Sequence, residues 1–332
     1  MKLLFTLDYE LFLGSRTGSV ANCLITPMEQ LQAAIESAGG KFTIFVDATY
    51  LFRARQLSIG YPQLARDVEQ ISSHLKQLVA SGHDVQLHIH PHWAFSTYND
   101  GMWLLDHKHY KLCDLDAETA LQVTTQAKEL LDTTIGRKTI AFRAGGFAAQ
   151  PTAMLKELFL KNDIVADCSV CPGLSYSSPQ QEFDYTKAPA KDCYRFDDDI
   201  CTEDAGGRFT EFPITMHRVS PVFHWKLAAN RLLKLQEHRT FGDGAAVKTT
   251  GESIVARLTS WQNCQATIDG YKISFLPQAW QATRHRGNEL LTILGHPKLA
   301  TPYSIDRLAK FVQQATAAGD TFTTISQMLA AQ

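Results

Sequence analysis

The chain has 332 residues, of which 45% are hydrophobic and 20% are charged, and its formal net charge is −2. These values are normal for a globular enzyme with one large domain or two ordinary ones. The nearly neutral charge and the absence of long basic runs argue against nucleic acid as a main partner.

Apolar runs and cysteines indicate the compartment. No stretch approaches the roughly 18 apolar residues of a transmembrane helix, and Met1 to Phe5 is too short for the core of a signal peptide. We therefore expect a cytoplasmic protein without a membrane span. The seven cysteines fit a reducing compartment. Cys168 and Cys171 have the spacing of a redox pair, but without a thioredoxin-like context we expect two ordinary buried thiols.

Strands and helices are predicted to alternate along the first half of the chain. Residues 3–7 form a short apolar run that ends at Asp8, which indicates a buried strand. Thr26 and Pro27 open a helix that ends before Gly39. The further predicted strands are 42–46, 84–88, 139–143 and 164–167, and the further helices are 63–80, 117–133 and 151–161. This alternation is typical of a parallel sheet with helices outside it.

The second half is less regular. Residues 177–207 are rich in Asp, Pro, Gly and Ser, so we expect a long insertion or lid at about 174–207. Its acidic triplet, 197–199, is expected to be a solvated loop. The remaining predicted strands are 210–215, 290–294 and 322–325, and the helices are 222–238, 252–264 and 304–318.

Residues that carry chemistry end several of the predicted strands. They are Asp8, Asp47, His88, Arg143 and Asp167. In barrels of alternating strands and helices the active site lies at the carboxyl ends of the strands. These residues are therefore expected to share one face of the sheet.

Two segments together offer a set of metal ligands. Asp8 and Glu10 flank Tyr9, so an extended chain points both carboxylates to one side and the tyrosine to the other. His88, His90 and His92 follow a strand, and a tight turn there can bring two imidazoles to one ion. Two imidazoles with one or two carboxylates are the usual ligands of a catalytic divalent metal.

Three further residues have two interpretations each. Arg143 precedes Gly145 and Gly146, and its guanidinium can hold a catalytic carboxylate or lie on the surface. His296 can donate a proton or be an ordinary residue at a strand end. Trp93 can form an apolar wall of the site or pack in the core.

Taken in order, these segments resemble the polysaccharide deacetylase family, the carbohydrate esterase family 4 with a NodB-like domain. The resemblance lies in residues 6–10, 82–92, 142–146, 167–173, 212–214 and 294–297. It implies a single domain over residues 1–332 with a distorted (β/α)7-type barrel. The first motif departs from the commoner adjacent Asp-Asp form, because Tyr9 separates the two carboxylates.

The resemblance also implies roles. Asp8 is the base, and the metal ligands are Glu10, His88 and His92. Arg143 orients the base, and His296 is the general acid. The residues expected to bind substrate are His90, Trp93, Gly145, Gly146 and Asp167.

The function implied is removal of an N-acetyl group from a sugar by a metal-dependent hydrolase. Zinc is the default metal, with cobalt, nickel, manganese and iron as the others. The expected substrate is a nucleotide-linked or lipid-linked acetamido sugar of surface-polysaccharide synthesis. The sequence leaves open a ferrous oxygenase with two histidines and one carboxylate, a non-catalytic glycan-binding barrel, and a hydrolase of non-sugar amides such as cyclic ureides.

Overall fold

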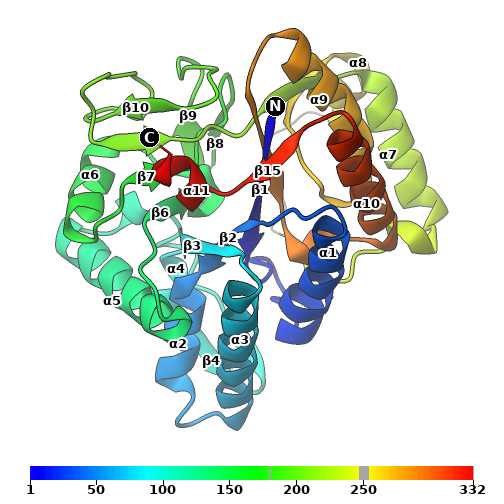
Figure 1. Ribbon diagram of the computed structural model, residues 1–332. Helices are drawn as coiled ribbons and strands as arrows, with labels where there is room; N and C mark the ends of the chain where they lie inside the picture. Colours follow the sequence, from blue (N-terminus) through cyan, green and yellow to red (C-terminus); the bar gives the residue numbers. More distant parts are fainter. Residues whose placement is uncertain (179–180, 247–253, 332) are drawn as a thin grey trace. The chain divides into compact units, whose positions relative to one another are not determined.

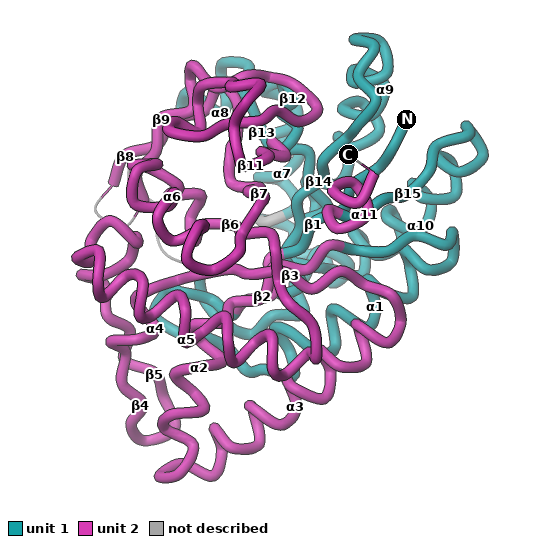
Figure 2. Tube along the Cα trace, turned by 60° about the vertical axis from the view of Figure 1, so that its left-hand side comes forward, with its two compact units in different colours: residues 1–7, 11–42, 214–324 teal, residues 8–10, 43–213, 325–332 magenta. Residues whose placement is uncertain are grey.

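The structure is a computed structural model that describes residues 1–178, 181–246 and 254–331. The chain forms two compact units (Figure 2). Unit 1 contains residues 1–7, 11–42 and 214–324, and unit 2 contains residues 8–10, 43–213 and 325–332. The prediction of one domain over residues 1–332 stays a prediction.

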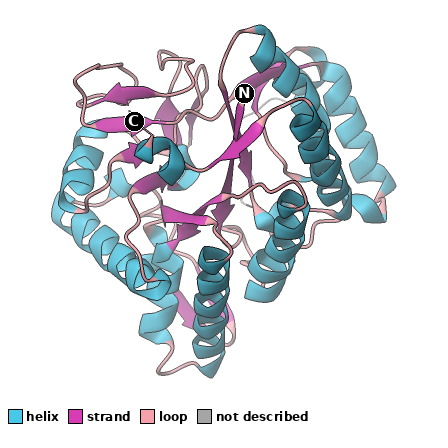
Figure 3. Cartoon of the chain, in the orientation of Figure 1, coloured by secondary structure: helices cyan, strands magenta, loops and turns pink. Residues whose placement is uncertain are grey.

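Unit 2 is built on a largely parallel sheet (Figure 3). Its strand order is β10-β11-β7-β6-β3-β2, and among these neighbours only β10 and β11 are antiparallel. These strands are β2 (Thr43–Asp47), β3 (Asp84–Ile89), β6 (Ala141–Ala144), β7 (Ala166–Asp167), β10 (Tyr194–Phe196) and β11 (Phe209–Glu211). The four strands predicted between residues 42 and 167 are therefore present.

The helices of unit 2 alternate with these strands (Figure 1). They are α2 (Ala48–Leu57), α3 (Pro62–Ala80), α4 (His92–Phe95), α5 (Ala117–Ile135), α6 (Thr152–Lys161) and α11 (Ile325–Ala330), with short 3-10 turns at η2 (Leu112–Asp114) and η3 (Gly145–Phe147). α5 begins at Asp116, whose carboxylate accepts from the Thr119 amide, and ends at Gly136 in the left-handed conformation. The alternation expected for a barrel of strands and helices is confirmed.

The predicted insertion contains short strands. Outside the insertion, β4 (Thr97–Asn99) pairs with β5 (Met102–Leu104). Within it, β8 (Ser175–Ser177) pairs antiparallel with β9 (Glu182–Asp184). The segment then returns to the main sheet through β10. Asp197 of the acidic triplet pairs with Arg208 and Lys156, so this loop is tied down by ion pairs.

Unit 1 contains the first and last strands of the chain. β1 (Lys2–Tyr9) pairs in parallel with β14 (Leu290–Gly295) and with β15 (Thr321–Thr323), and β12 (Met216–Val219) pairs with β13 (Gln262–Gln265). The helices are α1 (Thr26–Glu36), α7 (Pro221–Leu233), α8 (Ile254–Thr259), α9 (Leu276–His285) and α10 (Pro302–Ala317), with shorter turns at η1 (Ala21–Ile25), η4 (Gln236–His238), η5 (Gly270–Phe275) and η6 (Pro297–Leu299). Phe5 of β1 packs edge-on against Phe42 and Phe311 in the core of this unit.

Several predicted boundaries in unit 1 are wrong. Thr26 does not cap α1, because the π-helical turn η1 runs directly into it. The helix predicted over 222–238 ends at Leu233, because Lys234 takes a left-handed conformation. The helix predicted over 252–264 is α8 followed by β13, and its residues 252–253 lie outside the described residues. Within the described ranges, no helix combines the length and hydropathy needed to cross a membrane.

Candidate active site

The ends of neighbouring strands in unit 2 bring the predicted residues together. Asp47 of β2 is the register partner of His88 of β3, and His88 is the register partner of Arg143 of β6. Because these strands are parallel, their carboxyl ends lie at one edge of the sheet. Asp47 itself caps α2, where its carboxylate accepts from the Tyr50 amide and the Thr49 hydroxyl. Its role here is therefore to start a helix.

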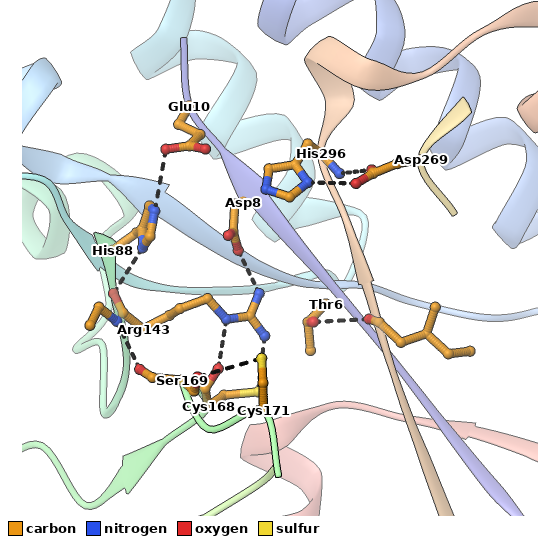
Figure 4. A network of polar contacts seen from close by, with 12 residues as sticks. Thr6, Asp8, Glu10, His88, Arg143, Cys168, Ser169, Cys171, Asp269 and His296 are labelled. Atoms are coloured by element: carbon orange, nitrogen blue, oxygen red, sulfur yellow. Dashed lines mark hydrogen bonds and ion pairs between the residues drawn. The ribbon is translucent and has the colours of Figure 1, made fainter. Parts of the chain in front are cut away.

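The side chains of Asp8, Tyr9 and Glu10 alternate as an extended chain requires. The Tyr9 hydroxyl lies 2.9 Å from Nδ1 of His74, a residue of α3. Asp8 pairs with Arg143, and Glu10 lies beside His88 (Figure 4). Glu10 also lies beside His90. The two carboxylates thus serve a different set of partners from the tyrosine, as predicted.

Glu10, His88 and His90 form a compact group of possible metal ligands. Oε2 of Glu10 lies 2.6 Å from Nε2 of His90 and 3.4 Å from Nε2 of His88. One donor atom from each of the three residues lies within 4.8 Å of the others, and all three side chains are buried. Two imidazole nitrogens and a carboxylate oxygen are a known ligand set of catalytic zinc and of other divalent metals. The residues present therefore fit a divalent cation.

His88 is oriented by a backbone contact. Its Nδ1 lies 2.8 Å from the carbonyl oxygen of Arg143, and a carbonyl can only accept, so Nδ1 carries the hydrogen. This places Nε2 toward Glu10, as in metal sites whose histidines are fixed through their second nitrogen. Burial alone would lower the pKa of His88, but the charges of Asp8 and Glu10 outweigh it and raise the pKa to about 9.

Arg143 holds Asp8 from a completely buried position. Its Nη1 lies 2.5 Å from Oδ1 of Asp8, its Nε donates to the Cys168 carbonyl at 2.7 Å, and its guanidinium lies over the Phe45 ring. Burial opposes the charge of Arg143, but the neighbouring Asp8 carboxylate outweighs it and raises the arginine pKa further. The predicted pairing of this arginine with the candidate base is therefore present in the structure.

Gly145 makes room for His90. A Cβ at Gly145 would lie 2.5 Å from Nδ1 of His90 and 2.6 Å from the carbonyl oxygen of Ile89. Gly146 has a φ of +59°, and its carbonyl oxygen accepts from the Gln181 amide. Both glycines thus shape the turn beside the histidines, and their predicted contact with substrate stays a prediction.

His92 and Trp93 lie in an aromatic cluster. His92 starts α4 and stacks on Tyr110 at 5.1 Å with an interplanar angle of 9°. Trp93 is completely buried and packs against Tyr50 and Trp103. His92 is outside the group formed by Glu10, His88 and His90. The structure therefore brings together two of the three predicted metal ligands and adds His90, which was expected to contact substrate.

Asp167 and Glu211 form a buried carboxyl pair. Asp167 accepts from the amide and hydroxyl of Ser169, and its register partner in β11 is Glu211, which accepts from the Val170 amide. Burial and the neighbouring Asp167 raise the pKa of Glu211 well above its usual range, so Glu211 keeps a proton that the pair can share. Asp167 is thus placed to fix the loop that follows it, and its predicted contact with substrate stays a prediction.

Cys168 and Cys171 are buried thiols. Sγ of Cys168 lies 2.9 Å from Nη2 of Arg143. Burial raises the pKa of Cys168 to about 12, so its thiol is a poor nucleophile at neutral pH. The expectation of ordinary buried thiols agrees with these surroundings.

His296 lies in unit 1, directly after β14, and is held by Asp269 (Figure 4). Its backbone amide donates to Oδ1 of Asp269 at 2.8 Å, and its Nδ1 lies 2.9 Å from Oδ2. Burial opposes ionisation of Asp269, but the His296 charge outweighs it and lowers the carboxyl pKa. A carboxylate on Nδ1 fixes the ring and directs Nε2 to proton transfer.

Sequence reasoning missed three residues that support these side chains: Tyr110, Glu211 and Asp269. Asp269 carried a weak signal, because it follows Ala266-Thr267-Ile268 and precedes a glycine. Glu211 carried none, since a single Glu before Phe212 reads as the exposed side of a strand. Tyr110 lies in a loop, and its stacking on His92 depends on tertiary structure.

Comparison with known proteins identifies the fold. No protein-family model and no curated protein matches the chain. A candidate polysaccharide deacetylase from Mycobacterium smegmatis is 14% identical with a TM-score of 0.56, covering 98% of this chain and 88% of its own. Puue allantoinase is 13% identical with a TM-score of 0.53, covering 98% and 87%.

A third solved structure is 4-alpha-glucanotransferase from Thermococcus litoralis, at 13% identity and a TM-score of 0.53, covering 100% of this chain and 38% of its own. At these identities the likeness concerns the fold alone. The predicted α/β class, a distorted (β/α) barrel shared with polysaccharide deacetylases, is thereby confirmed.

Proposed function

We propose that the protein is a metal-dependent hydrolase that removes the N-acetyl group of a sugar. The observation that carries this proposal is the arrangement within unit 2, where Asp8, buried and paired with Arg143, lies two residues before Glu10 of the Glu10–His88–His90 group. A carboxylate fixed in direction beside a cation site is what water attack on an amide requires. The resemblance seen in the sequence motifs supports the same reaction.

Glu10, His88 and His90 would hold the cation, with zinc as the default and cobalt, nickel, manganese or iron as the others. When bound there, a divalent metal lowers the pKa of a water molecule and polarises an acyl oxygen. The sequence predicted His92 in place of His90. We favour His90, because its Nε2 lies 2.6 Å from Glu10 and a glycine is required beside its ring.

Asp8 acts as the base in this proposal. It accepts the proton of the water that attacks the N-acetyl carbonyl, while the contact with Arg143 fixes its direction. Arg143 is itself held by the carbonyl of Cys168, so the base is positioned through two buried contacts. This leaves few orientations open to the carboxylate, which favours proton transfer.

His296 is proposed as the general acid. Asp269 holds Nδ1, so Nε2 is the atom that would give a proton to the departing amine. Without that proton the tetrahedral intermediate would expel water again, because an amide anion is the poorer leaving group. The cytoplasmic location and the role in surface-polysaccharide synthesis, both predicted from the sequence, remain proposals.

The test is metal analysis of the purified protein followed by an acetate-release screen on N-acetylated sugars. We expect about one divalent ion per chain, and acetate release that a chelator stops and the metal restores. Ring opening of allantoin, which releases no acetate, is measured in a separate assay, because one solved structure of similar fold is an allantoinase. Oxygen uptake with a 2-oxoacid, without acetate release, would replace this proposal by the ferrous oxygenase that the same ligand set allows.

A further inference from the structure

Unit 1 contains a cavity of about 590 Å³ to which the proposed reaction assigns no role. It lies between the end of α7 with η4 and the segment that begins at Asp269. Sites for small ligands commonly have volumes of roughly 300 to 1,000 Å³. The cavity therefore has room for a sugar with an attached group.

The lining of this cavity is positively charged. Lys234, Arg239 and Lys272 contribute to it, while Asp269 is its one acidic residue among those described. None of the three cations forms an ion pair with a residue in the described parts of the chain. Asp269 is already paired with His296. The charge of the three cations is thus available to a ligand.

Neutral groups in the lining suit a sugar. Asn230 and Gln236 offer amide donors and acceptors, and Tyr271 and His238 form an aromatic wall with ring centroids 5.4 Å apart. Amides and aromatic edges are the groups that fix a polar, partly apolar ring. The cavity therefore combines features for a sugar ring with features for an anion.

We propose that this cavity binds a phosphorylated acetamido sugar, with the phosphoryl group held by Lys234, Arg239 and Lys272. This inference rests on the proposed function for its acetamido part and names the class of substrate. Asp269 lines the cavity and also holds His296, so a ligand here would contact the carboxylate that orients the proposed general acid. Cationic side chains around a phosphate form charge-assisted hydrogen bonds, which are stronger than neutral ones.

The carrier of the phosphate can be a nucleotide or a lipid. Leu232 and Leu233 directly precede Lys234 in the chain and are 82% and 67% exposed, and Leu235 lines the cavity itself. Exposed leucines can bury apolar surface against the hydrocarbon chain of a lipid diphosphate, whereas a nucleotide offers no such chain. The shared feature is the phosphoryl group on the sugar, and the experiment separates the two carriers.

The first test measures binding by calorimetry to the metal-loaded protein. Glucose 1-phosphate and N-acetylglucosamine 1-phosphate are compared with N-acetylglucosamine. We expect both phosphates to bind at least about 10-fold tighter than the neutral sugar, and to lose about 10-fold in Lys234→Ala, Arg239→Ala or Lys272→Ala. Lys310→Ala is the matched control, since Lys310 is exposed in α10 and pairs with Asp306. Equal binding of phosphate and neutral sugar, or equal loss in the control, would overturn the proposal.

The second test separates this inference from the proposed function. Binding is repeated in Asp8→Asn, where turnover should stop while the cavity is unchanged. Phosphate-dependent binding without acetate release from any substrate would remove the deacetylase and leave the cavity as a sugar-phosphate site. Acetate release from neutral sugars, unaffected by the three cavity variants, would keep the deacetylase and remove this inference.

The third test identifies the carrier. A nucleotide diphosphate-linked acetamido sugar is compared with a polyprenyl diphosphate-linked one in detergent, using wild type and the double variant Leu232→Ser, Leu233→Ser. If the carrier is a lipid, the double variant should lose about 10-fold in affinity for the lipid-linked sugar and none for the nucleotide-linked one. A nucleotide carrier predicts no change in the double variant. If neither substrate binds more tightly than N-acetylglucosamine, the proposal fails.

Discussion

Asp8 and Arg143 form a buried ion pair in which Nη1 of the arginine lies 2.5 Å from Oδ1 of the aspartate. The arginine side chain is completely buried, and its Nε and Nη2 donate to the carbonyl oxygen and Sγ of Cys168. Neither charge can turn to water, so the attraction between the two offsets part of the cost of burying them. This attraction makes the pair testable both by activity and by stability.

Asp8→Asn should abolish most acetate release without removing the metal. The amide cannot accept the proton of water, and loss of a general base costs about 10²- to 10⁴-fold in rate. Glu10, His88 and His90 are unchanged, so metal content should equal that of wild type. The check is kcat for acetate release beside metal analysis of the same sample. A variant with full kcat would take Asp8 out of the mechanism.

Arg143→Met should unfold the chain more easily by about 3–5 kcal/mol. It removes the buried charge that pairs with Asp8, and removing one partner of a buried pair has costs of this size. Urea denaturation measures the change. Lys138→Met is the control, because the Lys138–Asp163 pair is exposed and should contribute at most about 1 kcal/mol. Equal effects of the two substitutions would mean that Asp8 finds another partner or is neutral.

His90→Gln and His92→Gln distinguish the two possible ligand sets. If Glu10, His88 and His90 are the ligands, His90→Gln should lower metal affinity strongly. The loss should exceed the ~10- to 100-fold that is typical when a residue hydrogen-bonded to a ligand is replaced. His92→Gln should keep the metal, because the His92 ring stacks on Tyr110. Titration of the metal-free protein with zinc gives both affinities. The reverse order would restore the ligand set predicted from the sequence.

The sequence was a good guide wherever local pattern decides geometry. The alternation of Asp8, Tyr9 and Glu10 along an extended chain predicted their opposite directions, and the Tyr9–His74 contact agrees with it. The strand before His88 and the one that contains Arg143 were likewise predicted, because apolar runs ending in a polar residue are typical of buried parallel strands.

Tertiary contacts decided what the sequence did not predict. The resemblance to the deacetylase motif favoured His92 over His90, whereas in the structure His92 begins a helix and stacks on a residue 18 positions downstream, Tyr110. α2 was missed because its first turn, Ala48–Leu51, is buried on every side and shows no apolar stripe. The pairing of Asp167 with Glu211 depends on the register of β7 with β11, which joins residues 44 positions apart.

Stability should fall as the pH drops from about 6.5 to about 4, through His74. Burial is the main cause that lowers the pKa of this histidine to about 4, and the nearby His83 adds to it. The folded protein therefore binds the proton less readily than the unfolded chain. The contribution of neutral His74 to the free energy of unfolding is therefore fully present above pH 6.5. Below that pH it falls by up to about 1.4 kcal/mol per pH unit, until His74 is protonated in the folded state too.

The measurement for His74 is the difference in unfolding free energy between wild type and His74→Gln at several pH values. Gln does not titrate, and its side-chain oxygen can accept from the Tyr9 hydroxyl in place of Nδ1. The difference should change by on the order of 3 kcal/mol between pH 6.5 and 4 and then level off. A difference that is constant over this range would show that His74 keeps an ordinary pKa.

Gly145→Ala should weaken both the fold and the metal site, whereas Gly60→Ala should do neither. The added methyl group at residue 145 would lie 2.5 Å from the His90 ring and 2.6 Å from a backbone oxygen, and the backbone oxygen cannot move aside as a flexible side chain does. Overpacking of this kind costs about 1–3 kcal/mol, and displacement of His90 moves a ligand away from Glu10. At Gly60 the nearest atom to an added Cβ is 3.9 Å away, an ordinary contact.

Thermal unfolding with and without zinc separates the effect on the fold from the effect on the metal site. Because the metal stabilises only a chain that binds it, the zinc-dependent rise in Tm should shrink for Gly145→Ala and stay at the wild-type value for Gly60→Ala. A full rise for Gly145→Ala would mean that His90 is not a ligand or that the turn adjusts without moving it.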